Sequence, residues 1–294
     1  MANGSGQIPV LDCVRSAWQF LLRNGRRLAP AAIIVALVAE IGPIIGMLTG
    51  AADAGSASTL APSLGNFVSM LPGILASLVF TAAILRLAVR DEFIGATGLL
   101  LGPDELRLLG VFAGLMCIII PFGALVFLIV SVVVISRLAS SPAELQRLLD
   151  DPDAMSTALE TTLGPAGSAA FLLFMFAAIG IFIYVATRLF MMNAATIGER
   201  RIVMFQTWKW SRGNVLRMLG ALLLTWLPAS LIDTMIYSLA ATVFSGVASP
   251  SNAALTIPIF HIITTFVTAM LSIPSVVVGA ILYKGLRPAD FVAK

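Results

Sequence analysis

The chain has 294 residues, of which 59% are apolar and only 11% are charged, and its formal net charge is +3. A water-soluble domain carries about 25% charged residues, so this composition excludes an ordinary soluble protein. It indicates a chain surrounded by lipid, because a water-facing protein needs a polar coat that this sequence does not provide.

The segment 8–24, at the start of the chain, has the pattern of an amphipathic helix lying on the cytoplasmic surface of the membrane. One helical face carries Val10, Leu11, Val14, Ala17, Trp18, Leu21 and Leu22, and the other carries Asp12, Arg15, Gln19 and Arg23. Basic amphipathic helices with tryptophan lie in the headgroup plane and prefer anionic lipid. The alternative is a surface connector that only fixes topology. We expect no cleavable signal peptide, because the first long apolar run starts only after Arg26 and Arg27.

Six apolar runs follow, each long enough for a membrane span of about 20 residues. They cover about 28–50, 67–89, 108–136, 168–187, 215–245 and 253–283. The runs are continuously apolar rather than alternating, which excludes a transmembrane barrel. We therefore predict an all-α, polytopic membrane protein of six transmembrane helices arranged as three hairpins, with interfacial amphipathic helices. Gly42 and Gly46 have the G-x-x-x-G spacing that permits close helix packing.

The connection 137–167 is the only sizeable loop expected on the outer, periplasmic side. Ser141, Pro142 and Glu144 have the pattern of a helix start, and a second short helix is expected around Met155 to Leu163. The acids at 150, 151 and 153 between them lack the spacing of a calcium-binding loop, so we interpret them as a solvated turn.

A second interfacial segment is expected at 199–212, where apolar and aromatic residues are mixed with basic ones. Together with the N-terminal segment it defines a candidate interface for anionic lipid. Its residues are Arg15, Trp18, Arg23, Arg26, Arg27, Trp208, Lys209, Trp210, Arg212 and Arg217.

The distribution of basic residues predicts the orientation in the membrane. All lysine and arginine residues except Arg137 and Arg147 fall in segments that six spans would place on one side. Because basic residues concentrate in cytoplasmic loops, both ends of the chain are expected in the cytoplasm. This bias accounts for the net charge, which gives no reason to expect a nucleic-acid partner.

Several short motifs resemble a known family. They are Arg188-Leu189, Thr207-Trp208, Ser211-Arg212-Gly213-Asn214, Arg217-Met218-Leu219-Gly220 and the segment 102–107. This block is similar to the glycerophosphodiester phosphodiesterase membrane-domain family and related six-helix bacterial inner-membrane proteins, although Asn193 stands where that family often has proline. The resemblance implies a six-helix module of the bacterial inner membrane. In some relatives it is fused to a soluble phosphodiesterase, whose histidines cannot be present here because His261 is the only histidine.

Ionisable residues within the apolar runs are the candidates for a site, because charges are costly inside a bilayer. Glu40, Asp233 and His261 could converge on a cavity that binds a proton, a cation or a polar headgroup. The alternative is that each specifies helix packing through a hydrogen bond to Tyr237, Thr225 or Ser69, or, for His261, lies in water at the interface. Cys117 lies in an apolar run and is expected to be buried.

No catalytic constellation is present in the sequence, and we expect neither enzyme activity nor a metal or cofactor. Three functional classes remain. The first is a non-enzymatic inner-membrane module that handles lipid, scaffolds or regulates, with membrane lipids as partners. The second is a small secondary transporter that uses Glu40 and Asp233. The third is an accessory subunit bound to other membrane protein subunits. We favour the first.

Overall fold

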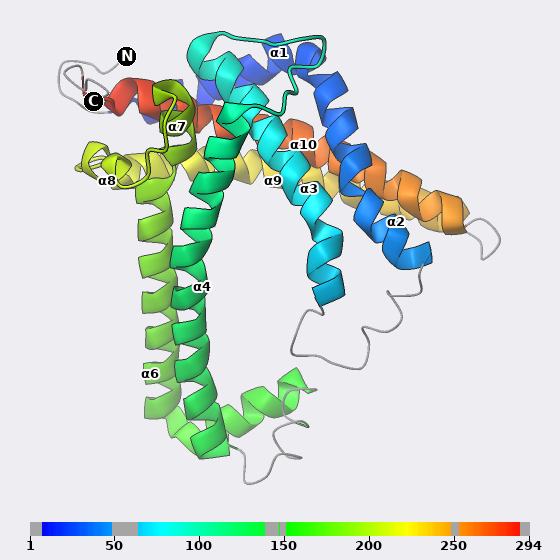
Figure 1. Ribbon diagram of the computed structural model, residues 1–294. Helices are drawn as coiled ribbons and strands as arrows, with labels where there is room; N and C mark the ends of the chain where they lie inside the picture. The colour runs from blue at the N-terminus through cyan, green and yellow to red at the C-terminus, as the bar shows by residue number, and fades with distance from the viewer. Residues whose placement is uncertain (1–7, 49–63, 139–146, 148–150, 248–252, 289–294) are drawn as a thin grey trace. The chain divides into compact units, whose positions relative to one another are not determined.

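The computed structural model describes residues 8–48, 64–138, 147, 151–247 and 253–288 (Figure 1). All regular secondary structure in these ranges is helical. Six helical segments are long and apolar enough to cross a membrane: Val10–Ile45, Ser69–Arg90, Pro103–Ile129, Gly164–Glu199, Val215–Gly246 and Thr256–Leu286. The prediction of an all-α chain with six apolar helices is therefore confirmed.

The chain divides into two compact units, Met1–Val111 with Thr187–Lys294, and Phe112–Ala186. The first unit contains most of the packed core. Its helices are α1 (Val10–Ala39), α2 (Ile41–Leu48), α3 (Leu64–Leu85), the π-helix η2 (Arg86–Arg90), α7 (Met192–Glu199), α8 (Gln206–Trp210), α9 (Val215–Val247) and α10 (Ala253–Leu286). The helices α4 (Pro103–Leu138) and α6 (Pro152–Leu189) run from this unit into the second.

Helix α1 runs without a break through the segment 8–24 and into the first apolar run, with Pro30 inside it. Its buried face is made largely of small residues, including Ala17, Gly25, Ala31 and Ala32. Small side chains let two helices approach closely, which is a common basis of helix association in membranes. This face accounts for the extensive packing of α1 against α10.

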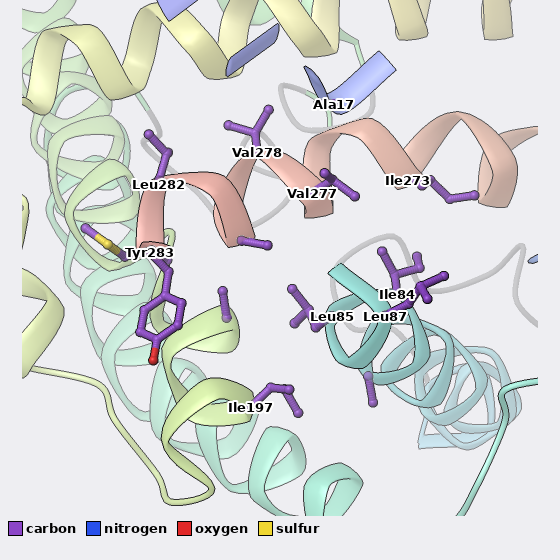
Figure 2. Packing of buried hydrophobic residues seen from close by; sticks show 14 of the residues in the cluster. Ala17, Ile84, Leu85, Leu87, Ile197, Ile273, Val277, Val278, Leu282 and Tyr283 are labelled. Atoms are coloured by element: carbon purple, nitrogen blue, oxygen red, sulfur yellow. The ribbon is translucent and has the colours of Figure 1, made fainter. Parts of the chain in front are cut away.

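The centre of the first unit is an apolar cluster to which α3, α7 and α10 contribute. Figure 2 shows Ile84 and Leu85 of α3, Ile197 of α7 and Val277 and Leu282 of α10 within this cluster. All five side chains are buried. The end of α3, the short helix α7 and the last third of α10 are thus held together by apolar contact.

Helices α2 and α3 meet at a glycine. A Cβ atom built on Gly42 would lie 1.7 Å from the backbone oxygen of Ser69, so only glycine fits there without movement of the backbone. One turn further along α3, a Cβ atom on Gly73 would lie 3.5 Å from the Cβ of Ala39. The close packing expected from the G-x-x-x-G spacing is therefore present at Gly42.

The second unit contains the larger parts of α4 and α6, whose rings Phe122 and Phe182 stack with centroids 6.5 Å apart. The apolar side chains are mostly exposed, among them Ile120, Leu125, Phe127, Leu128, Leu172, Leu173 and Phe176. The helix from Pro152 is interrupted at Gly164, which has φ 63° and ψ 177°.

Two sequence expectations concern this part of the chain. Cys117 is exposed, so the expectation that it is buried is wrong: it lies on a span whose apolar residues the described helices leave largely uncovered. The helix start expected at Ser141, Pro142 and Glu144 lies outside the described residues.

Candidate functional site

Glu40 lies at the junction of α1 and α2 and is only 6% exposed. Thr265 of α10 donates a hydrogen bond from its hydroxyl to Oε1 of Glu40 at 3.2 Å. The residue that caps α1 is therefore a carboxylate turned into the first unit, within a segment apolar enough to cross a membrane.

Asp233 lies on α9 and is partly buried. The hydroxyl of Thr268 donates a hydrogen bond to Oδ1 of Asp233 at 2.9 Å. Thr265 and Thr268 are three residues apart on α10, about 4.5 Å along the helix axis. Glu40 and Asp233 are far apart in sequence, but the structure bonds both to α10, at positions about one helical turn apart.

The partners of these carboxylates differ from the ones considered from the sequence. The hydroxyl of Thr225 instead donates to the backbone oxygen of Ala221 at 2.8 Å. The ring of Tyr237 packs edge-on against Phe260, with centroids 5.3 Å apart. Thr225 and Tyr237 lie close to Asp233 in sequence but do not bond to it. The two acids instead accept hydrogen bonds from threonines of α10.

His261 is exposed and lies one turn from Thr265 toward the start of α10. Its ring packs edge-on against Phe260 at 5.4 Å, and it makes no side-chain hydrogen bond to any residue that the structure describes. Of the three predicted site residues, the structure therefore associates Glu40 and Asp233 with one stretch of α10 and leaves His261 outside their hydrogen bonds.

A second polar region lies where α3, η2 and the start of α4 meet, and it contains a buried ion pair. Nη1 of Arg86 lies 2.5 Å from Oε1 of Glu105, with the two side chains 2% and 6% exposed, and Nη2 donates to the backbone oxygen of Gly98 at 3.0 Å. Arg90 pairs with Asp104, and Arg107 lies 2.7 Å from the same carboxylate.

The sequence 102–105 explains why these acids gather at the start of α4. Oε2 of Glu105 accepts a hydrogen bond from the backbone N–H of Gly102 at 3.0 Å, which is one half of a capping box. Asp104 lies in the first turn, where a negative charge is favoured by the helix dipole. We did not predict these pairs, although the acidic first turn after two arginines was a usable signal.

A further set of polar contacts joins α7 to the end of α10. Glu199 accepts a hydrogen bond from the Tyr283 hydroxyl at 2.5 Å and pairs with Arg287 at 2.6 Å. Arg200 pairs with Glu92 at 3.2 Å. Many basic residues that the sequence placed on one side are therefore neutralised by acids within the first unit.

Another set of basic residues is exposed, and its side chains make no hydrogen bond or ion pair to any described residue. We call this set the basic belt; it comprises Arg15, Arg23, Arg26, Lys209 and Arg212. Large apolar side chains are exposed in the same segments: Leu11, Leu22, Phe205, Trp208 and Leu216. Exposed cations and exposed apolar side chains thus occur together in these segments, and their role as an interface with lipid stays a prediction.

The other predicted interface residues have partners inside the first unit. The guanidinium of Arg27 lies over the Phe93 ring at 4.1 Å, and Arg217 donates to the backbone oxygen of Ile8 at 3.5 Å. Trp210 packs beside Tyr283 with centroids 6.1 Å apart, and Trp18 is partly buried. The contact between Arg217 and Ile8 joins the start of α9 to the start of α1.

The described residues contain no group of three or more histidine, cysteine, aspartate or glutamate side chains able to hold a metal ion. In comparisons with protein-family models, with curated proteins and with solved structures, no match to this chain was found. The class of protein that the six long apolar helices suggest is a multi-pass membrane protein.

Proposed function

We propose that this protein is a non-enzymatic module of the bacterial inner membrane that has both ends in the cytoplasm and handles lipid or acts as a scaffold. Its lipid contact is the basic belt, which holds anionic headgroups on the cytoplasmic side. The resemblance of residues 186–220 to bacterial inner-membrane proteins favours this location.

The observation that carries the proposal is the division of the basic residues into two sets. Arg86, Arg90, Arg107 and Arg287 are paired with acids, whereas the basic belt is exposed in the same segments as the exposed apolar residues Leu11, Leu22 and Trp208. A cation near an anionic membrane surface gains about 1 kcal/mol. Unpaired cations in segments that also expose apolar side chains therefore suit an anionic lipid surface better than bulk water.

Helices α4 and α6 support the membrane location independently. In the most apolar stretches of these two helices, 0% and 6% of the residues are buried inside the protein. Nearly all of this apolar surface therefore has to be covered by something other than the described helices. Lipid chains can cover this surface without leaving backbone groups unsatisfied, because a helix makes its backbone hydrogen bonds internally. A partner subunit could cover it as well, and the experiment below distinguishes the two.

The test is native mass spectrometry of the chain released from its own membrane, with identification of the lipids that remain bound. We expect selective retention of anionic lipid, and about a tenfold loss when the whole basic belt is replaced by glutamine. Arg23→Gln and Arg200→Gln form a matched pair, since both remove an exposed cation but Arg200 is already paired with Glu92. Only the first should weaken retention, and more so at low salt.

Equal retention by the wild type and the belt variant would overturn the lipid contact. A protein that co-purifies at fixed stoichiometry, without lipid, would make this chain an accessory subunit.

Secondary transport is a second candidate, favoured by the hydrogen bonds from Thr265 and Thr268 to Glu40 and Asp233. Carboxylates inside apolar helices are common in proton and ion pathways. In proteoliposomes, Glu40→Gln and Asp233→Asn should fold normally and abolish proton-coupled flux, whereas Glu92→Gln should retain it. If cells carrying both variants keep wild-type function, the two acids are structural.

A further inference from the structure

A small pocket lies in the first unit where α3, the junction of α6 and α7, and α10 meet. Its volume is about 110 Å³, and its apolar lining includes Leu85, Phe190 and Val276. The pocket is separate from Glu40 and Asp233 and from the basic belt, so neither proposed function uses it.

Three uncharged polar side chains line this pocket, one from each element: Thr81 of α3, Asn193 of α7 and Ser275 of α10. None of them makes a side-chain hydrogen bond to any residue that the structure describes. Each is partly exposed, and each lies within a segment apolar enough to cross a membrane.

Other hydroxyl groups on the same helices are satisfied by their own backbone. Ser77 of α3 donates to the oxygen of Gly73 at 2.7 Å, and Ser272 of α10 donates to the oxygen of Ala269 at 2.7 Å. Thr81 and Ser275 lie four and three residues further along the same helices and lack such a bond. The polar groups of Thr81 and Ser275 are therefore available to a molecule that enters the pocket.

The backbone around the pocket is also interrupted. Helix α6 ends at Leu189 and α7 begins at Met192, so Asn193 and Ala194 lie in the first turn of a helix, where backbone N–H groups have no partner within the helix. On the facing helix, a Cβ atom at Gly279 would lie 3.3 Å from the Phe190 ring. The glycine therefore keeps the junction and α10 close together beside the pocket.

We infer that this pocket binds a small uncharged polar molecule, of about the size of glycerol, through Thr81, Asn193 and Ser275. The lining contains hydroxyl and carboxamide groups, which both donate and accept hydrogen bonds, and no charged side chain. A charged ligand would find no counter-ion there. An apolar ligand would leave three polar groups unsatisfied, so a neutral molecule with hydroxyl or amide groups fits best.

The test is saturation-transfer NMR on the full-length protein in phosphatidylcholine nanodiscs, with glycerol and acetamide as probes. We expect saturable binding of at least one probe, at one site per chain. Asn193→Leu should reduce its affinity more than tenfold, and Thr81→Val and Ser275→Ala about fivefold each. The matched control is Ser272→Ala, which removes a hydroxyl from the same helix outside the pocket and should change affinity less than twofold.

Thr81→Ser keeps the hydroxyl and should retain binding, which separates loss of the polar group from loss of the fold. The proposal is overturned if neither probe binds saturably, which would leave the pocket to water alone. It is also overturned if Ser272→Ala weakens binding as much as Ser275→Ala does.

Discussion

At the scale of single residues, Arg86 and Glu105 form a buried ion pair. The two groups are 2.5 Å apart and both are almost fully buried. Removing one partner of such a pair leaves a buried charge without compensation.

We therefore expect Glu105→Gln to destabilise the protein by about 3–5 kcal/mol, the usual cost of breaking a buried pair. The measurement is the unfolding free energy in mixed micelles. Arg200→Gln is the control, because Arg200 and its partner Glu92 are 65% and 39% exposed and an exposed pair contributes about 1 kcal/mol or less. Equal effects of the two variants would show that the Arg86 site tolerates an unpaired charge.

The sequence pointed to Glu40 and Asp233 through one physical rule, the cost of a charge within an apolar segment. It did not identify Thr265 and Thr268 as their partners, because neither position is near the acids in sequence: 225 residues separate Glu40 from Thr265. Thr81, Asn193 and Ser275 were missed for the same reason. Nothing in their local sequence shows that three helices bring them to one pocket.

At the scale of elements, Gly42 determines how closely α2 approaches α3. Gly42→Ala places a Cβ atom 1.7 Å from the backbone oxygen of Ser69, so the helices must separate. We expect a loss of stability of about 1–3 kcal/mol, as in other overpacked contacts.

Gly123→Ala is the matched control for that measurement. Gly123 lies inside α4, and a Cβ atom added there would have no neighbouring atom within 4 Å. Alanine should therefore be neutral or should stabilise by about 0.5–1 kcal/mol through its helix propensity. If both alanine variants have the stability of the wild type, the contact between α2 and α3 is not close in solution.

The apolar runs identified the six long helices because length and hydropathy are local properties of the sequence. The positions at which helices break are harder to predict from the sequence. The interruption at Gly164 could be read from Gly-Pro, but the break between Leu189 and Met192 has neither glycine nor proline. The sequence predicts an interfacial segment at 8–24 and a separate span from about residue 28. The structure instead has one continuous helix, α1, which packs against α10.

At the scale of the whole molecule, the distribution of arginine and lysine predicts which parts of the chain lie in the cytoplasm. A fluorescent protein fused to the C-terminus should fold and fluoresce in the cytoplasm. Alkaline phosphatase should be active when fused after Arg147 and inactive when fused after Arg90. An active phosphatase at Arg90 would reverse the orientation and move the basic belt away from the cytoplasmic leaflet.

The order of α1 and α10 along the chain has a consequence for biosynthesis. The partner of Glu40 is made 225 residues after it, and at about 5–20 residues per second this delay is about 10–50 s. During that time the first helix exists without the threonine that later binds its carboxylate. Until α10 has been made, the Glu40 carboxylate needs another hydrogen-bond donor, such as water or a lipid headgroup. The contact between α1 and α10 therefore forms late in synthesis.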